Sequence, residues 1–344
     1  MNAGKRQFAL LTVLLSWLLW VSGCRTNDDS GNLPTSLLTD PTIFIPAGTL
    51  RAPEGIAVDN TGDVWVADTF HDAVRRYSNT GSERVSLPGM IRPRMMGLDR
   101  FSSTLLVVAD RKKIYRIDPA GDTASIVFDA NVSPIDTTSV FDLRTGVTRA
   151  RIVQAPLLGD IDGGQTGDIY CNAVASSAEN FVLRIRGTQC DALTYSPIRP
   201  LISADIMSRF LSVDRFGTVF TSFVTFADQQ VTEVFAFGVF PGNLTSSAAL
   251  PSGIISPGTY GSGIDNTGIL FIADATSQQL LILSTSSGQT LETIPIPAIT
   301  GLTRPSPRDV AVASDGSVFV VLTDLSDTGN SLGAVLKFGR SVQH

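Results

Sequence analysis

Five positions in this chain, each just ahead of a recurring hydrophobic segment, carry side chains that could bind a small charged molecule. They are Glu54, Arg94, Arg209, Tyr260 and Arg308. Arginine guanidinium groups bind carboxylates and phosphates through paired hydrogen bonds. Three arginines in alternate segments would therefore point at one anionic ligand, with Glu54 as a counter-ion and Tyr260 as a hydroxyl group. The alternative is that each arginine pairs with a nearby carboxylate such as Asp309 and only braces the fold.

Groups suited to metal binding or catalysis are sparse elsewhere. The chain has two histidines, His71 and His344, which excludes a three-histidine metal site. For His71 we favour a surface loop position over a role as catalytic base. The segment Asp160–Asp168, D-I-D-G-G-Q-T-G-D, has the spaced carboxylates and glycines of a calcium loop but lacks the glutamate that completes an EF-hand. We therefore favour a glycine-rich turn over calcium, and predict no catalytic residue, metal or cofactor.

Two of the three cysteines fall within one repeat. Cys171 and Cys190 could form a disulfide in an oxidising compartment. However, Cys171 is predicted to lie in mid-strand, with its hairpin neighbour near Arg184. A disulfide and a pair of free thiols both stay open.

The elements that must position these residues are repeated hairpins. The segment Gly55–Asp68, G-I-A-V-D-N-T-G-D-V-W-V-A-D, has the pattern of a hydrophobic strand, a tight turn and a second hydrophobic strand. The pattern recurs around Gly167, Gly217, Gly268 and Gly316, with a degenerate copy at Met96–Asp110. One strand position carries an aromatic residue in five copies, namely Trp65, Tyr170, Phe220, Phe271 and Phe319. We expect these rings to pack between neighbouring sheets.

Each copy continues into a third strand and usually a fourth, more polar one. The predicted third strands are Val74–Tyr77, Lys113–Ile117, Phe181–Ile185, Thr232–Phe237, Leu280–Leu283 and Ala334–Phe338, and fourth strands include Glu83–Leu87 and Thr290–Ile294. Four antiparallel strands in each of six copies predict an all-β, six-bladed β-propeller. The last copy lacks a fourth strand. Pro41–Pro46 could supply it from the other end of the domain and so close the ring. Aspartates such as Asp59, Asp214 and Asp265 are expected to cap the hairpin turns.

The first copy resembles an NHL repeat. Residues Pro53–Thr69, P-E-G-I-A-V-D-N-T-G-D-V-W-V-A-D-T, follow its pattern of a G-I-A-V-D strand, a glycine turn and a V-Y-V-A-D-T strand. Weaker copies extend the resemblance over about Pro41–Arg340. The resemblance implies a propeller. It constrains function weakly, because the family includes binding scaffolds, lyases and hydrolase-like relatives.

Gluconolactonase-like propellers are the alternative that this resemblance raises. They hold a calcium ion with Glu, Asn and Asp side chains around a central channel. Glu54 would be the equivalent glutamate, but the matching positions in the other copies are Arg94, Leu157, Arg209, Tyr260 and Arg308. Arginines there would repel calcium, so these residues do not support a metal-dependent hydrolase.

The widest gap between copies is an insertion at Phe128–Pro156. Long insertions in propellers lie on one face and often meet the ligand. A solvated hairpin is the interpretation that we favour, and ligand contact is the alternative.

The N-terminus resembles a bacterial lipoprotein signal. Lys5 and Arg6 precede the apolar run Phe8–Val21, and Val21-Ser22-Gly23-Cys24 ends it with small residues and a cysteine. The resemblance implies a signal peptide at 1–23, lipidation of Cys24, a flexible tether at 24–40, the propeller at 41–340 and a tail at 341–344. An ordinary secretory peptide is the alternative. Because Arg25 is not the aspartate associated with inner-membrane retention, the resemblance implies an outer-membrane location, facing the periplasm or the surface.

The composition agrees with an exported β protein. Charged residues make up 17% of the chain and the formal net charge is −6, which argues against a nucleic-acid binder. We predict a lipid-anchored, monomeric propeller outside the cytoplasm, held to the membrane by its N-terminal lipid. It would be a non-catalytic module that binds a protein, a peptide or a small anionic ligand. The alternative is a propeller-type hydrolase or lyase, similar to gluconolactonase or strictosidine synthase, with an atypical site.

Overall fold

The computed structural model describes residues 36–120, 122–131, 140–142, 147–149, 156–164, 166–174, 180–187, 189–194, 210–224, 231–240, 243–244, 248–250, 259–326 and 331–341. Contacts divide the chain into Ser36–Ser341 and a second unit of Met1–Thr35 with Val342–His344, and the described residues all lie in the first. Their fold is almost entirely β, with one short 3-10 helix, η1 (Thr69–His71). None of the helical residues described forms a segment long and apolar enough to span a membrane.

The repeated unit is a run of antiparallel strands in sequence order. In the first unit, β2 (Gly55–Val58), β3 (Val64–Asp68), β4 (Ala73–Tyr77) and β5 (Glu83–Pro88) form one sheet. β2 and β3 are buried throughout, whereas β5 alternates between exposed and half-buried residues. This is the pattern of a sheet whose early strands are covered on both faces and whose last strand faces solvent.

The remaining units repeat this order. They are β6 (Pro93–Asp99), β7 (Thr104–Ala109), β8 (Lys113–Asp118) and β9 (Thr123–Asp129); β12 (Leu157–Gly163), β13 (Ile169–Val174), β14 (Asn180–Arg186) and β15 (Gln189–Thr194); β16 (Leu211–Val213), β17 (Thr218–Val224), β18 (Val231–Phe240), β19 (Asn243–Leu244) and β20 (Ala248–Leu250); β21 (Thr259–Ile264), β22 (Ile269–Asp274), β23 (Gln279–Ser284) and β24 (Thr290–Pro295); and β25 (Pro305–Val312), β26 (Val318–Asp324) and β27 (Leu332–Phe338) with β1 (Thr42–Arg51). The predicted third and fourth strands are therefore confirmed, with ends that differ by a few residues.

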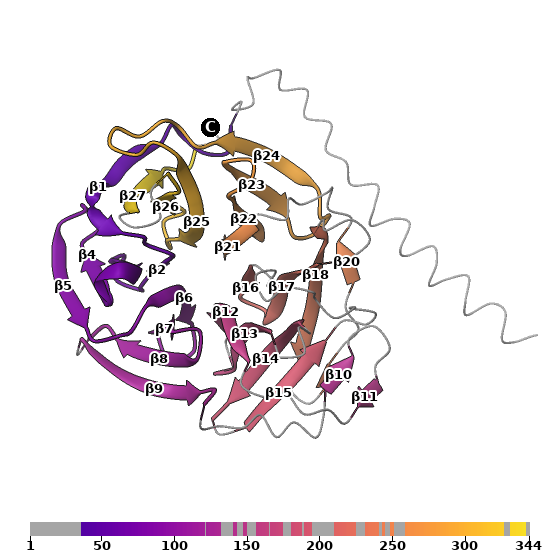
Figure 1. The fold of residues 1–344 in the computed structure, drawn as a ribbon. Coiled ribbons are helices and arrows are strands. Elements are labelled where there is room, and N and C mark those ends of the chain that lie inside the picture. The colour runs from indigo at the N-terminus through magenta and orange to yellow at the C-terminus, as the bar shows by residue number, and fades with distance from the viewer. Residues whose placement is uncertain are drawn as a thin grey trace, which may run out of the picture. The chain divides into compact units, whose positions relative to one another are not determined.

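The innermost strands of the units form a closed ring. β2 contacts β6, β6 contacts β12, β12 contacts β16, β16 contacts β21, β21 contacts β25, and β25 contacts β2. Figure 1 shows them nearest the centre, with the later strands of each unit further out. A radial set of antiparallel sheets is a β-propeller, as predicted. One parallel pair, Gly163 with Asp99, joins β6–β9 and β12–β15 into a single sheet, and the count of six blades stays a prediction.

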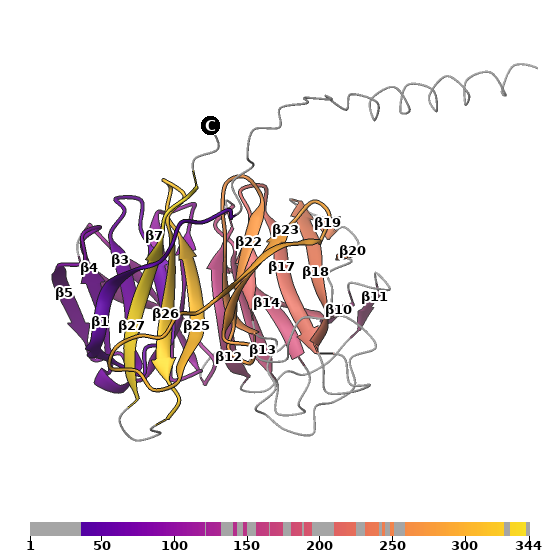
Figure 2. The same cartoon turned by 90° about the horizontal axis from the view of Figure 1, so that it is seen from above.

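The N-terminal strand completes the last sheet, which confirms the predicted closure. β1 pairs antiparallel with β27, from Thr42 opposite Lys337 to Arg51 opposite Leu332. Figure 2 shows the indigo β1 beside the yellow β27. The strand is longer than the predicted Pro41–Pro46, and two register shifts bend it along the edge of the sheet.

Residues ahead of the predicted start of the propeller at Pro41 also pack on it. Leu38, which was assigned to the flexible tether, is 3% exposed and pairs with Arg340. Ser36 donates a hydrogen bond from its hydroxyl group to Glu292 of β24. The last residues of the predicted tether therefore pack on the propeller. The predicted signal peptide and Cys24 lie outside the described residues.

The aromatic residue at the repeated strand position belongs to the core, as expected. The five side chains, Trp65, Tyr170, Phe220, Phe271 and Phe319, are at most 3% exposed. They lie on the second strands of five different units, and four of them contribute to separate hydrophobic clusters, for example Phe271 with β26 residues and Phe220 with β22 residues. The aromatic side chain thus recurs at this position of the repeat because it packs between neighbouring blades.

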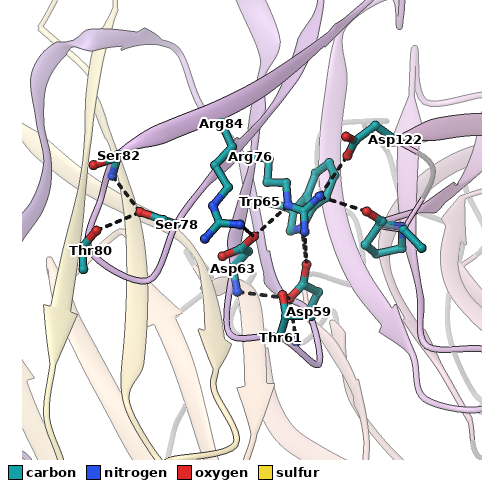
Figure 3. Close-up of polar contacts among 12 residues, drawn as sticks. Asp59, Thr61, Asp63, Trp65, Arg76, Ser78, Thr80, Ser82, Arg84 and Asp122 are labelled. Atoms are coloured by element: carbon teal, nitrogen blue, oxygen red, sulfur yellow. Dashed lines mark hydrogen bonds and ion pairs between the residues drawn. The ribbon is translucent and has the colours of Figure 1, made fainter.

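The turn aspartates cap their hairpins, and the first one also holds the core tryptophan. The Asp59 carboxylate accepts hydrogen bonds from the backbone N–H of Thr61 and from Trp65 Nε1, the latter at 2.9 Å (Figure 3). The Arg76 guanidinium lies 5.0 Å from the centre of the Trp65 ring and reaches Asp122 in the next unit. Asp214 and Asp265 accept backbone hydrogen bonds within their own turns. These residues serve the fold.

The disulfide left open by the sequence is not formed. Cys171 and Cys190 are free thiols. Cys171 in β13 lies opposite Leu183, and Cys190 in β15 lies opposite Ile185, so that β14 separates the two. Two strand spacings amount to about 9.5 Å, which exceeds the ~7 Å between Cα atoms that a disulfide can span. Burial raises the pKa of the Cys190 thiol to about 12.

Part of the predicted insertion is described, and it is a hairpin. β10 (Val140–Asp142) pairs antiparallel with β11 (Val147–Arg149), and β10 also pairs in parallel with β15. In that sheet the hairpin lies at the edge opposite to the inner strand β12. The described part of the insertion is therefore remote from the centre of the ring, and the rest of it lies outside the described residues.

Candidate functional site

The inner strands bring four of the predicted site residues together where these strands begin. Glu54 directly precedes β2, Arg94 and Tyr260 are the second residues of β6 and β21, and Arg308 lies in the first half of β25. We call these four residues the mouth ring. β2 contacts β6 and β25, and β25 contacts β21, so the four occupy successive places around the ring. Arg209 lies outside the described residues.

Glu54 and Arg94 form the ion pair of the mouth ring. Arg94 Nη1 lies 2.8 Å from Glu54 Oε2, and the two side chains are 25% and 22% exposed. Burial lowers the pKa of the Arg94 guanidinium from its ordinary value, while Glu54 acts in the opposite direction. The Glu54 carboxylate thus contacts an arginine of the neighbouring blade, which for Arg94 is the kind of pairing that the bracing alternative predicted.

Arg308 has a different environment from Arg94. Its guanidinium carbon lies 4.5 Å from the centre of the Tyr260 ring, a distance at which a cation is attracted to an aromatic face. Its Nε atom is buried and has no hydrogen-bond partner among the described residues. Asp309, the partner suggested by the sequence, accepts backbone hydrogen bonds instead. The interpretation that Arg308 pairs with Asp309 to brace the blades is therefore wrong.

Further arginines surround the ion pair. Arg111, Arg92 and Arg308 each lower the pKa of Arg94, so all three guanidinium groups lie within electrostatic reach of it. Arg92 and Arg111 have φ angles of 46° and 53°, in the left-handed region. Arg111 is a central residue of the turn that the Lys112 N–H closes on Ala109 O, and two-residue hairpin turns of this kind place both central residues at positive φ. Within the described part of the chain, Glu54 is the carboxylate that pairs with any of these four cations.

Two buried carboxylates lie directly below the mouth ring. Asp309 follows Arg308 in β25, and Asp160 occupies the equivalent position in β12; they are 1% and 2% exposed. Ile56 N–H donates to Asp309 at 3.0 Å, and Leu211 N–H donates to Asp160 at 2.6 Å. The edge of each inner strand that faces the centre has no further strand to accept its N–H groups, and a carboxylate from the preceding blade supplies the acceptor.

These two carboxyl groups titrate abnormally. Burial raises the pKa of both well above the usual range. The negative charge of Asp309 raises the pKa of Asp160 further, and Asp162 does the same for Asp309, while the backbone N–H donors act in the opposite direction. Like charges in one poorly solvated space cannot all ionise together.

The raised pKa values predict that the protein loses stability as the pH rises. The native state holds protons on Asp160 and Asp309 that the unfolded chain releases above about pH 4, so stability falls from there up to the native pKa values. We expect the melting temperature of the wild type to fall as the pH is raised above about 4. In Asp160→Asn the fall should be smaller. Asp315→Asn, at an exposed turn, should keep the wild-type profile, and equal profiles for all three proteins would contradict the assignment.

A small cavity continues inward along the inner strands. It has a volume of about 50 Å³ and is lined mainly by apolar residues of β2, β6, β21 and β25, together with Arg100, Asp162 and Ser262. Arg100 lies 3.1 Å from Asp162 at the end of the inner strands away from the mouth ring. The cavity holds a few water molecules at most, so a ligand would be bound at the mouth rather than inside the ring.

The other residues considered for chemistry serve the fold. His71 lies in η1, and its Nδ1 is 2.7 Å from the buried carboxylate of Asp68. The three carboxylates of the segment Asp160–Asp168 have separate partners, because Asp162 pairs with Arg100 and Asp168 pairs with Arg186. Among the described residues, no three His, Cys, Asp or Glu side chains come together as a metal site.

The structure also corrects one alignment and adds two residues. Gly167 closes its turn as Gly62 does, so Gly159, and not Leu157, occupies the position of Glu54 in the third copy. Sequence reasoning did not single out Arg111 or the pairing of Asp160 with a neighbouring backbone. A signal for Asp160 was present, because an aspartate there interrupts an otherwise apolar strand. For Arg111, which lies in a turn, the sequence offers no such signal.

Comparisons with known proteins agree with this architecture. The NHL repeat family matches residues 50–75, which include β2, β3 and η1. The chain is a β-propeller that carries an NHL repeat. No curated protein sequence matches it. The match covers the first copy, where the sequence pattern was also clearest.

Solved structures share the propeller over most of the chain. A gluconolactonase from Xanthomonas campestris superposes with a TM-score of 0.59 at 14% identity, covering 88% of this chain and 89% of that one. A streptogramin B lyase gives a TM-score of 0.57 at 10% identity, with 88% and 98% covered. The nidogen/laminin complex gives 0.51 at 14% identity, with 72% and 81% covered. At these identities the likeness concerns the fold.

Proposed function

We propose that this propeller takes up a small organic anion at its mouth ring. The observation that carries the proposal is the state of its two described arginines. Arg94 is balanced by Glu54, whereas Arg308 lies against Tyr260 and has a buried Nε without a partner among the described residues. A guanidinium whose buried Nε–H lacks a hydrogen-bond acceptor is suited to a carboxylate or phosphate group.

A hydrolase or lyase is the better supported of the two predicted classes. A gluconolactonase and a lyase share the fold over most of the chain, and two buried carboxyls with raised pKa lie directly below the mouth ring. Perturbed carboxyls beside a ligand site are more frequent in catalytic sites than elsewhere. A non-catalytic module, whose structural counterpart is the nidogen/laminin complex, would use the same mouth ring for binding only.

The proposed setting is the one that the N-terminus predicts. Lipidation of Cys24 would hold a monomeric propeller at the outer membrane, and the short ordered segment from Ser36 would attach it to the remaining tether. An anionic substrate would then be met outside the cytoplasm. Calcium is not part of the proposed site, because the mouth ring presents cations.

Arg308→Gln is the variant that tests the binding proposal. Removal of the charge should weaken the binding of small carboxylates such as benzoate and gluconate by roughly ten- to a hundredfold, as for one charge-assisted hydrogen bond. Titration calorimetry measures the change. Arg304→Gln is the matched control, because Arg304 is an exposed arginine directly before β25 and should leave binding unchanged. Equal affinities for the wild type and Arg308→Gln, or an equal loss in both variants, would reject the mouth ring.

A second measurement separates the two classes. Release of acid from a panel of lactones and esters, followed at constant pH, should be faster with the wild type than with Arg308→Gln. Binding without any turnover in that panel would favour the non-catalytic module and leave the anion site intact.

A further inference from the structure

The mouth ring and the two arginines beside it, Arg92 and Arg111, together hold more positive charge than the Glu54 carboxylate can balance. Four guanidinium groups, those of Arg92, Arg94, Arg111 and Arg308, interact electrostatically around one ion pair with Glu54. Among the described residues, the remaining three arginines have no ion-pair partner. The chain as a whole is acidic, with a formal net charge of −6, so this local excess of positive charge is opposite in sign to the net charge of the protein. Arg94, Arg111 and Arg308 are partly buried and Arg92 is exposed, and such a local excess of positive charge is suited to a ligand of more than one negative charge.

We propose that Glu54 is a built-in counter-ion which one anionic group of the ligand displaces from Arg94, while a second group binds Arg308. The ligand is therefore an organic dianion. This inference rests on the proposed function and adds the class of ligand and the role of Glu54.

The ion pair has the properties of a replaceable contact. Its closest approach, 2.8 Å, joins Arg94 Nη1 to Glu54 Oε2. Both side chains keep about a quarter of their surface exposed, so Glu54 can turn to solvent without crossing the core. A two-point contact from a ligand carboxylate would satisfy the same guanidinium better, because the fork geometry matches two oxygens.

The position of Arg308 supplies the second contact. The Arg308 guanidinium lies over the Tyr260 ring, and its Nε–H, which has no acceptor among the described residues, can donate a hydrogen bond to a ligand oxygen. A buried guanidinium nitrogen without an acceptor is costly, and a ligand oxygen would remove that cost. Arg94 and Arg308 lie on β6 and β25, which both contact β2, so the second group of the proposed ligand would reach Arg308 across that strand.

Backbone hydrogen bonds fix the chain at the two arginines next to the ion pair. Arg92 O accepts a hydrogen bond from Asp110 N–H, and Arg111 O accepts one from Leu158 N–H, so both left-handed arginines are fixed by their neighbours. Arg92 N–H is also bound by the Asp72 carboxylate. The backbone at both arginines is thus held in place by its neighbours.

Glu54→Gln in the full chain tests this inference. Removal of the competing carboxylate should tighten the binding of succinate by about tenfold, the worth of one charge-assisted hydrogen bond, and should leave the order of preference unchanged. Wild-type protein should bind succinate and inorganic phosphate at least tenfold more tightly than succinamate, which keeps one carboxylate and replaces the other by an amide. Titration calorimetry gives all of these affinities.

Glu83→Gln is the matched control. Glu83 lies 2.9 Å from Arg75 and belongs to an ion pair outside the mouth ring, so its loss should not change succinate binding. Weaker binding in Glu54→Gln would mean that Glu54 only positions Arg94, and would overturn the inference. Equal affinity for succinate and succinamate, both lost in Arg308→Gln, would also overturn it while the proposed anion site stands. No binding of succinate and phosphate alike would reject it as well.

Discussion

Replacement of Thr42–Arg51 by a glycine/serine linker of equal length is expected to abolish the cooperative unfolding of the propeller. β1 provides the outer strand of the last sheet and joins the two ends of the domain through its pairing with β27. Without it, β27 becomes an exposed edge and the ring has no covalent segment that spans its closure. Ile45 and Leu50, which are 1% and 0% exposed, would also be removed from the core.

The expected loss is comparable with the whole stability of a domain. Each buried aliphatic side chain contributes about 2–5 kcal/mol, and typical domains have ~5–15 kcal/mol in total. Differential scanning calorimetry should therefore find no sharp transition for the linker variant. A melting temperature equal to that of the wild type would refute the closure.

A graded variant keeps this prediction measurable if the linker variant does not fold. Leu50→Ala should lower the free energy of unfolding by about 3 kcal/mol. Ile43→Ala is the control in the same strand, because Ile43 is 53% exposed and its loss should change stability by less than about 0.5 kcal/mol. Equal effects of the two substitutions would show that burial of β1 does not contribute to the fold.

The strands could be predicted because the residues within each copy of the repeat determine the strands and turns of that copy. The predicted Ala334–Phe338 lies within β27, and the predicted Thr290–Ile294 differs from β24 by one residue. Turn glycines such as Gly62 adopt φ angles near 83°, which other residues rarely do, so they mark the hairpins in the sequence itself. The missing strand of the last copy followed from the same count.

The site could be predicted only as a set of positions. Equivalent places in the repeat identified Glu54, Arg94 and Arg308, because a varying residue stands out against a regular pattern. Their partners could not be predicted, because the contacts of Arg94 with Glu54 and of Arg308 with Tyr260 cross from one blade to the next. Such contacts depend on the angle and distance between blades, and a sequence pattern within one blade contains neither.

The fate of Asp309 shows the same limit. Its neighbour Arg308 made an ion pair plausible from the sequence, but adjacent residues of a strand point in opposite directions. Asp309 instead accepts a hydrogen bond from the backbone N–H of Ile56 in β2, which is 253 positions away in the chain. The backbone N–H groups at the inner edge of the inner strands need hydrogen-bond acceptors, and Asp309 supplies one. This need arises only when the ring is closed, so it is not visible in the sequence of one blade.

Close approach of the inner strands makes Gly55 the residue whose substitution should be most damaging within the repeat. A Cβ atom at Gly55 would lie 2.0 Å from the carbonyl oxygen of Arg94 and 2.8 Å from the backbone nitrogen of Met96. Both atoms belong to the backbone of β6, so no side chain can rotate away, and one blade must shift against the next. The same shift would move Arg94 away from Glu54, because these residues adjoin the clash.

Gly55→Ala should therefore destabilise the protein by about 3 kcal/mol or more, as expected for overpacking that the backbone must absorb. Gly62→Ala is the control from the same hairpin. Nothing lies within 4 Å of a Cβ there, so its φ of 83° leaves only the cost of the left-handed conformation, about 1 kcal/mol. Chemical denaturation of the two variants measures the difference. If Gly55→Ala were no less stable than Gly62→Ala, the contact between β2 and β6 would be looser than the structure has it, and the pairing of Glu54 with Arg94 across it would lose its support.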